Sequence, residues 1–161
     1  ELMQLVNDVL DLSRLEANMM KFQIQEYDAV ALCNDAIYMA RMRNEETIEI
    51  YFDTHIETQP ITTDTGRLIQ ALVSTLTYPQ KNTAHREITF TLTRDDSGKQ
   101  ICFRISNSPL ADPEFNSQEV SIRHDINRLL LQHFGGSYNI TADEQERPVI
   151  NFTYPLDIIS E

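Results

Sequence analysis

Apolar residues recur every three or four positions at the start of the chain, which indicates an amphipathic helix. The helix is expected over residues 2–16, and its apolar stripe is formed by Leu2, Leu5, Val6, Val9, Leu12 and Leu15. A narrow stripe of this kind often packs against a second chain in a coiled coil or bundle. We therefore expect this helix to meet a partner chain, and packing against its own domain is the alternative.

Three more helices follow from the same spacing. The first begins after Asp28, a good N-cap, and buries a face made of Ala29, Leu32, Cys33, Ala36, Ile37 and Ala40. The next begins at Asp64 and is expected to stop at Pro79, because proline cannot donate the helical hydrogen bond. The last ends at the pair Gly135-Gly136, since glycine readily adopts the left-handed conformation of a C-cap.

Apolar and polar residues alternate in the segments that are expected to be strands, which indicates half-buried strands. These segments are residues 47–53, 87–93, 101–105, 137–142 and 149–155, and 95–98 is a hairpin turn between the second and third. Residues 17–26, 54–63 and 107–118 are expected to be polar connections. The order predicts an α/β fold, a two-layer sandwich with a mixed sheet, preceded by an N-terminal helix.

Composition narrows the classes of partner. The 161 residues include 13 basic and 25 acidic side chains, a formal net charge of −12, which repels nucleic acid and anionic lipid surfaces. No apolar run approaches the roughly 20 residues of a membrane span. The length suits one domain plus an appendage. Because the first residues have the pattern of a helix interior, we expect the chain to be part of a longer protein. Cys33 and Cys102 are far apart in the sequence and are expected to be reduced, buried thiols.

Several segments together resemble one family. Residues 5–17, LVNDVLDLSRLEA, are similar to the end of the second dimerisation helix of sensor histidine kinases. The resemblance continues in the same order through three later segments: DTGRLIQ at 64–70, LLLQHFGG at 129–136 and FTYPL at 152–156. It implies residues 1–20 as the end of a dimerisation helix. It also implies residues 21–161 as a Bergerat-type (GHKL) ATP-binding domain.

The resemblance also implies how ATP would be held. An asparagine on the third helix holds Mg²⁺, an Asp-x-Gly-x-Gly turn binds adenine, and a second glycine run lets backbone amides reach the phosphates. The family's Asn-x-x-x-Asn pattern corresponds here to Ser74 and Tyr78, so a phenol replaces the magnesium ligand. Lys81 keeps the expected type. Asn82 would supply an amide only in a shifted register.

The adenine turn corresponds to residues 106–111, Ser-Asn-Ser-Pro-Leu-Ala. Asn107 replaces the carboxylate, and Pro109 and Ala111 replace the glycines. The second glycine run corresponds to residues 120–124, VSIRH, which contain no glycine. The chain has only four glycines, and all have other uses: one at a helix start, one in the hairpin and two at a helix end.

None of the four histidines is in a sequence context that indicates phosphorylation or metal binding. The family's phosphorylated histidine precedes a glutamate, but His55, His85, His124 and His133 precede Ile, Arg, Asp and Phe. The pair His124-Asp125 lacks the further ligands that a metal site needs. His133 is expected to be a cation at the negative end of its helix. We therefore expect no catalytic residue and no metal site.

The sequence thus predicts a two-component signalling module with a degenerate nucleotide pocket at Ser74, Tyr78, Lys81 and Asn107. No cofactor is expected. The module would be cytoplasmic, dimerise through its N-terminal helix, and dock a response-regulator receiver domain or a partner kinase, with no nucleic-acid or membrane contact. An active, ATP- and Mg²⁺-binding histidine kinase with an atypical pocket is the alternative. An unrelated acidic interaction domain is a third hypothesis, opposed by the ordered match.

Overall fold

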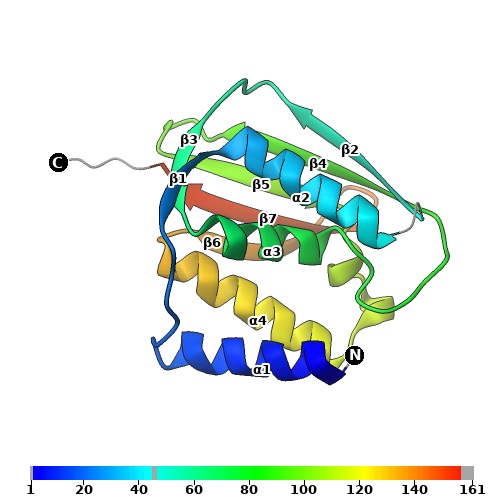
Figure 1. Ribbon diagram of the computed structural model, residues 1–161. Coiled ribbons are helices and arrows are strands. Elements are labelled where there is room, and N and C mark those ends of the chain that lie inside the picture. The colour runs from blue at the N-terminus through cyan, green and yellow to red at the C-terminus, as the bar shows by residue number, and fades with distance from the viewer. Residues whose placement is uncertain (1, 45–46, 157–161) are drawn as a thin grey trace.

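A mixed five-stranded sheet and the helices on one of its faces form the fold in the computed structural model, which describes residues 2–44 and 47–156 (Figure 1). The elements, in order, are α1 (Leu2–Glu16), β1 (Gln25–Asp28), α2 (Ala29–Asn44), β2 (Ile48–Thr54), β3 (Pro60–Thr63), α3 (Thr65–Thr75), β4 (Arg86–Arg94), β5 (Gln100–Ser106), the short 3-10 turns η1 (Pro109–Ala111) and η2 (Pro113–Phe115), α4 (Gln118–His133), β6 (Ser137–Ala142) and β7 (Pro148–Pro155).

The sheet order is β2-β4-β5-β7-β6, with β2 and β4 parallel and the other neighbours antiparallel. The strands alternate buried and exposed side chains, and the core lies between the sheet and α2, α3 and α4. Its largest fully buried side chains include Phe90, Phe103, Phe152 and Tyr154. The predicted α/β sandwich with a mixed sheet is therefore confirmed. None of the helices within residues 2–44 and 47–156 has the length and apolar character that crossing a membrane requires.

A second, two-stranded sheet was not predicted. β1 and β3 pair antiparallel, with Gln25 opposite Thr63. β1 begins in segment 17–26 and continues to Asp28, and β3 lies within segment 54–63; both segments were expected to be polar connections. Each strand has only four residues, too few for a periodic pattern, and the two are far apart in the chain. The predicted N-cap is confirmed, because a carboxylate oxygen of Asp28 accepts from the Ala31 amide at 3.1 Å.

The third helix ends earlier than predicted. α3 begins after the N-cap Asp64, as expected, but its last residue is Thr75 and not the residue before Pro79. The hydroxyls of Ser74, Thr75 and Thr77 each donate to a carbonyl three or four residues back, an interaction that competes with regular helix. The side chain of Asn44 donates to the Leu76 carbonyl and covers the helix end.

The C-terminal cap of α4 is confirmed as a Schellman motif. Gly135 has a φ of 84° and donates to the Gln132 carbonyl, and Gly136 donates to the Leu131 carbonyl. The reversal sends the chain directly into β6. The two thiols lie on different sides of the sheet, since Cys33 is in the core and Cys102 alternates with buried residues of β5. Cys102 is only half-buried, contrary to the expectation.

The helix α1 has two apolar faces. It lies beside α4 (Figure 1), with Asp8 buried and Leu5, Leu12 and Leu15 half-buried. The other face leaves apolar side chains exposed: Leu2, Met3, Val6, Val9 and Leu10. Part of the predicted apolar stripe therefore packs against the helix's own domain, which was the alternative in the sequence analysis. The rest of the stripe is exposed.

Candidate functional site

A cavity of about 450 Å³ lies between α1, the end of α3, the connection after α3 and the start of α4. Three of the four predicted pocket residues line it, namely Ser74, Tyr78 and Lys81. Asn107 does not, and neither does Asn82, whose side-chain oxygen accepts from the Ala84 amide in a local turn. The predicted segments thus border a cavity, but Asn107, which was predicted to replace the adenine carboxylate, does not line it.

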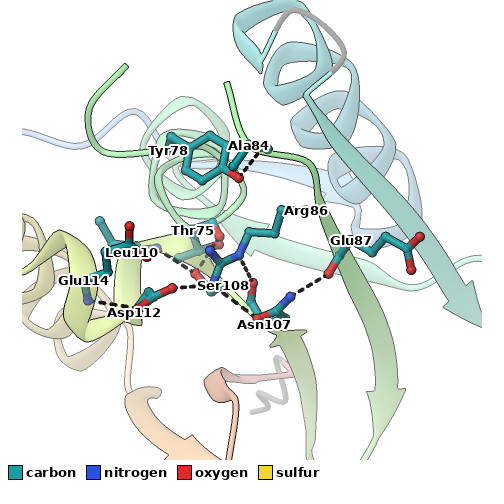
Figure 2. Close-up of polar contacts among 10 residues, drawn as sticks. All are labelled: Thr75, Tyr78, Ala84, Arg86, Glu87, Asn107, Ser108, Leu110, Asp112 and Glu114. Atoms are coloured by element: carbon teal, nitrogen blue, oxygen red, sulfur yellow. Dashed lines mark hydrogen bonds and ion pairs between the residues drawn. The ribbon is translucent and has the colours of Figure 1, made fainter. Parts of the chain in front are cut away.

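Both the hydroxyl and the ring of Tyr78 contact other residues of the domain. Its hydroxyl donates to the Ala84 carbonyl at 2.7 Å (Figure 2), and its ring packs edge-on against Phe115 with 5.4 Å between centroids. The residue lies beyond the end of α3, so the position that corresponds to the magnesium asparagine is no longer on the helix.

The side chain of Asn107 is hydrogen-bonded to the neighbouring strand β4. Its side-chain amide donates to the Glu87 carbonyl at 3.0 Å, and its side-chain oxygen accepts from Arg86 at 3.2 Å. The backbone carbonyl of Asn107 also accepts from the Arg86 Nε at 2.9 Å (Figure 2). The φ of 66° is a left-handed conformation that asparagine tolerates. The side chain is therefore bonded to residues of β4 and does not line the cavity.

Arg86 also forms an ion pair with Asp112 at 2.8 Å, and both side chains are largely buried. Ser108, which is fully buried, donates to the Thr75 carbonyl at 2.7 Å and accepts from the Leu110 amide (Figure 2). The connection 107–118 was expected to be a polar loop, but it contains η1 and η2 and buries Pro109, Leu110 and Phe115. We name residues Arg86, Asn107, Ser108 and Asp112 the turn network.

The segment 120–124, expected at the second glycine run, is part of α4. Within it Arg123 is buried and pairs with Asp8 of α1, with 2.6 Å between Nη2 and Oδ1. A second pair joins Arg67 of α3 to Asp11 of α1 at 3.1 Å. Both Asp8 and Arg123 line the cavity. One wall of the cavity is therefore α1 itself, held to the domain by charge.

The sequence analysis missed these charged residues because their partners are distant in the chain. Asp8 and Arg123 are 115 residues apart, and Arg86 and Asp112 are 26 apart. The one available signal was Arg123 at a position of α4 where an apolar residue would be expected. Such a residue indicates a buried partner without identifying it.

The histidines of α4 have structural contacts. The imidazole of His124 meets the Tyr138 hydroxyl through Nδ1 at 2.7 Å and the Leu110 carbonyl through Nε2 at 3.2 Å, so neither nitrogen is open to a metal. Burial lowers the pKa of His124 below its usual value. His133, at the end of α4, stacks on Phe22 with 4.2 Å between ring centroids.

No protein-family model and no curated protein matches the sequence. Solved structures match at the level of the fold. Full-length ShkA in complex with AMPPNP has a TM-score of 0.76 at 20% identity, covering 99% of this chain and 37% of that one. The histidine kinase AdeS of Acinetobacter baumannii has a TM-score of 0.69 at 13% identity, covering 95% and 77%.

The histidine kinase ThkA is similar in two forms. Its catalytic domain alone has a TM-score of 0.67 at 17% identity, covering 84% of this chain and 99% of that one. Its complex with the response regulator TrrA has a TM-score of 0.68 at 14% identity, covering 96% and 48%. The chain therefore has the fold of the catalytic domains of sensor histidine kinases, with a helix added before it.

Proposed function

We propose that this chain is a signalling module of a two-component sensor histidine kinase whose catalytic-domain fold has lost its nucleotide site. The observation that carries the proposal is the turn network. Residues 106–111 correspond to the family's adenine turn and contain no glycine. Directly after them, Asp112 forms a largely buried ion pair with Arg86, which also donates to the Asn107 carbonyl. Backbone can approach a nucleotide closely only where side chains are small.

Two other parts of the pocket also support the loss of the nucleotide site. Tyr78, at the position that corresponds to the magnesium ligand, donates its hydroxyl to a backbone carbonyl. Residues 120–124, which correspond to the phosphate-binding glycine run, are helical and include Arg123. Arg123 could attract phosphate, but it already faces Asp8 at 2.6 Å. Binding an anion there would leave the Asp8 carboxylate buried without its partner, which is costly.

We divide the chain into residues 1–20, the end of a dimerisation helix, and residues 21–161, the degenerate catalytic domain. Residues 1, 45–46 and 157–161 of this division lie outside the described residues. The module is proposed to act in the cytoplasm as a docking partner. The complex of ThkA with a response regulator supports a receiver domain as one partner, and an active kinase is the other. The net charge of −12 opposes nucleic acid.

An active kinase with an atypical pocket is the second candidate. The cavity of about 450 Å³ favours it, because that volume lies within the range of small-molecule sites and Lys81 and Arg43 line its wall. In that case ATP and Mg²⁺ would be the cofactors.

Nucleotide binding distinguishes the two candidates. We expect millimolar Mg-ATP or Mg-ADP to leave the melting temperature of the chain unchanged. A ligand at a hundred times its Kd adds about 2.7 kcal/mol of stability, which corresponds to roughly 5–10 °C for a chain of this size. The measurement is differential scanning fluorimetry, with ShkA, whose structure contains AMPPNP, as the positive control. A clear rise in the melting temperature of this chain would refute the loss of the site.

Dimerisation through α1 is the second part of the proposal. The exposed apolar face of α1 includes Val6 and Val9, one turn apart and each 43% exposed. We expect Val6→Glu to lower the fraction of dimer measured by sedimentation velocity, since it places a charge in the predicted helix–helix contact. Met42→Glu is the matched control, because Met42 is an exposed apolar residue on α2. Equal effects of the two substitutions, or a chain that stays monomeric at millimolar concentration, would contradict pairing through this face.

A further inference from the structure

Three metal-ligating side chains meet on the outer face of the sheet, away from the cavity. Glu49 is on β2, Glu87 is on β4, and His85 directly precedes β4. One ligand atom from each, the imidazole nitrogen and two carboxylate oxygens, lies within 4.8 Å of the other two. In the part of the chain that the structure describes, no other group of three His, Cys, Asp or Glu residues is arranged in this way.

The parallel register of β2 and β4 creates the group. It places Glu49 directly opposite Glu87, and like charges in that position repel each other. His85 Nε2 lies 3.7 Å from Glu49 Oε1 and 3.6 Å from Glu87 Oε2, so the imidazole is close to both carboxylates. An imidazole nitrogen together with two carboxylate oxygens is a ligand set suited to a cation of charge +2.

Two of the three distances between ligand atoms are close to those around a zinc-sized ion. Zinc ligands at about 2.1 Å in tetrahedral geometry are separated from one another by about 3.4 Å. The two imidazole–carboxylate distances are already within about 0.3 Å of that separation. The carboxylates have room to close the remaining gap, because all three side chains are at least half exposed (60%, 53% and 60% for His85, Glu49 and Glu87).

One ligand is already oriented by a neighbour. The hydroxyl of Tyr51, also on β2, donates to Glu49 Oε1 at 2.8 Å, and this bond raises the pKa of the tyrosine. Hydrogen bonds to ligating carboxylates from outside the metal's own ligand set are common in metal sites. A fourth coordination position would face solvent, because all three side chains are exposed.

The site adjoins the turn network. Neighbouring residues on a strand point to opposite faces, so Arg86 reaches Asn107 on one side of β4 while Glu87 points away from it (Figure 2). β2 lies at one edge of the five-stranded sheet, and among the described residues β4 is its one partner there. An ion held by Glu49, His85 and Glu87 would link the edge strand to the start of β4.

We propose that Glu49, His85 and Glu87 form a binding site for a divalent transition-metal ion such as Zn²⁺, with an open fourth position. The site is separate from the cavity, and neither Mg²⁺ nor a nucleotide takes part in it. Imidazole favours Zn²⁺ over Mg²⁺, which prefers an all-oxygen octahedral shell.

Isothermal titration calorimetry with zinc chloride at neutral pH tests the site. We expect the intact chain to bind one Zn²⁺ and to give no heat with Mg²⁺. His85→Ala should weaken zinc binding by roughly tenfold or more, as should the double substitution Glu49→Gln with Glu87→Gln. Tyr51→Phe should give a smaller weakening, because it removes only the orienting hydrogen bond.

His55→Ala is the matched control. His55 is an exposed histidine just beyond the other end of β2, and its removal should leave zinc affinity unchanged. Circular dichroism of each variant without metal checks that the fold is retained, which is expected because the substituted side chains are exposed. The proposal is overturned if the intact chain binds no zinc at millimolar concentration, or if His85→Ala binds it as tightly as the intact chain.

Discussion

Replacing Asp8 with alanine is expected to destabilise the protein by about 3 kcal/mol, because it leaves the guanidinium of Arg123 buried without a counter-charge. The two side chains are 2.6 Å apart and only 9% and 10% exposed. Gln4, which donates to the same carboxylate at 2.8 Å, would lose its partner too. The free energy of unfolding from urea denaturation measures the effect.

The matched control is Asp125→Ala. Asp125 pairs with Arg128 at 3.2 Å, but its side chain is 54% exposed, and exposed pairs contribute less than about 1 kcal/mol. If both substitutions changed the free energy of unfolding equally, α1 would not be held to the domain by the buried pair. The double variant Asp8→Leu with Arg123→Met should recover much of the loss, since it removes both charges together.

The attachment of α1 to the domain matters for the proposed function. A helix that is held by charge and also carries an exposed apolar face connects the domain rigidly to whatever α1 binds. Limited proteolysis within residues 17–24 should be faster in Asp8→Ala. This segment joins α1 to β1, and it would become more accessible if α1 were no longer held against α4.

Replacing Gly136 with alanine is expected to cost more than about 3 kcal/mol. A Cβ at this position would overlap the backbone carbonyl oxygen of Thr153 on β7 and press on the Leu131 side chain. The overlap is with backbone and cannot be relieved by a change of rotamer, so β6 and β7 would have to separate. Thermal unfolding followed by circular dichroism measures the loss.

Gly66→Ala is the control for this substitution. Gly66 is in the first turn of α3, and a Cβ there would meet only Asp64 Oδ1, at an ordinary contact distance of 3.7 Å. Alanine has a higher helix propensity than glycine, so this variant should be unchanged or more stable by up to about 1 kcal/mol. Equal losses at the two positions would show that close approach to β7 is not what requires Gly136.

Most helices and strands could be predicted because their periodicity is local. The alternation of Ile88, Phe90 and Leu92 on β4 is an example, and all three are fully buried. The paired strands β1 and β3 were not predicted, because a strand of four residues is too short to show a clear alternation of apolar and polar side chains. The early end of α3 was not predicted either, because it depends on serine and threonine hydroxyls that compete for helix carbonyls and on Asn44 from α2.

For the candidate site, the sequence by itself determined where glycine is absent. None of the four glycines is in residues 106–111 or 120–124, the segments that correspond to the family's two glycine motifs. Glycine is the residue whose lack of a side chain lets backbone approach a nucleotide, so this absence supports the proposed loss of the site without coordinates. The sequence also determined the fold class, because hydrophobic periodicity acts over a few neighbouring residues.

Only the tertiary structure decided which charged groups meet. Arg86 with Asp112, Asp8 with Arg123, and His85 with Glu49 and Glu87 are each brought together by strand register or helix packing between distant segments. A sequence records that these groups are charged but carries no local signal of their partners. The energies of such contacts depend on distance and burial, and both arise only when the chain is folded.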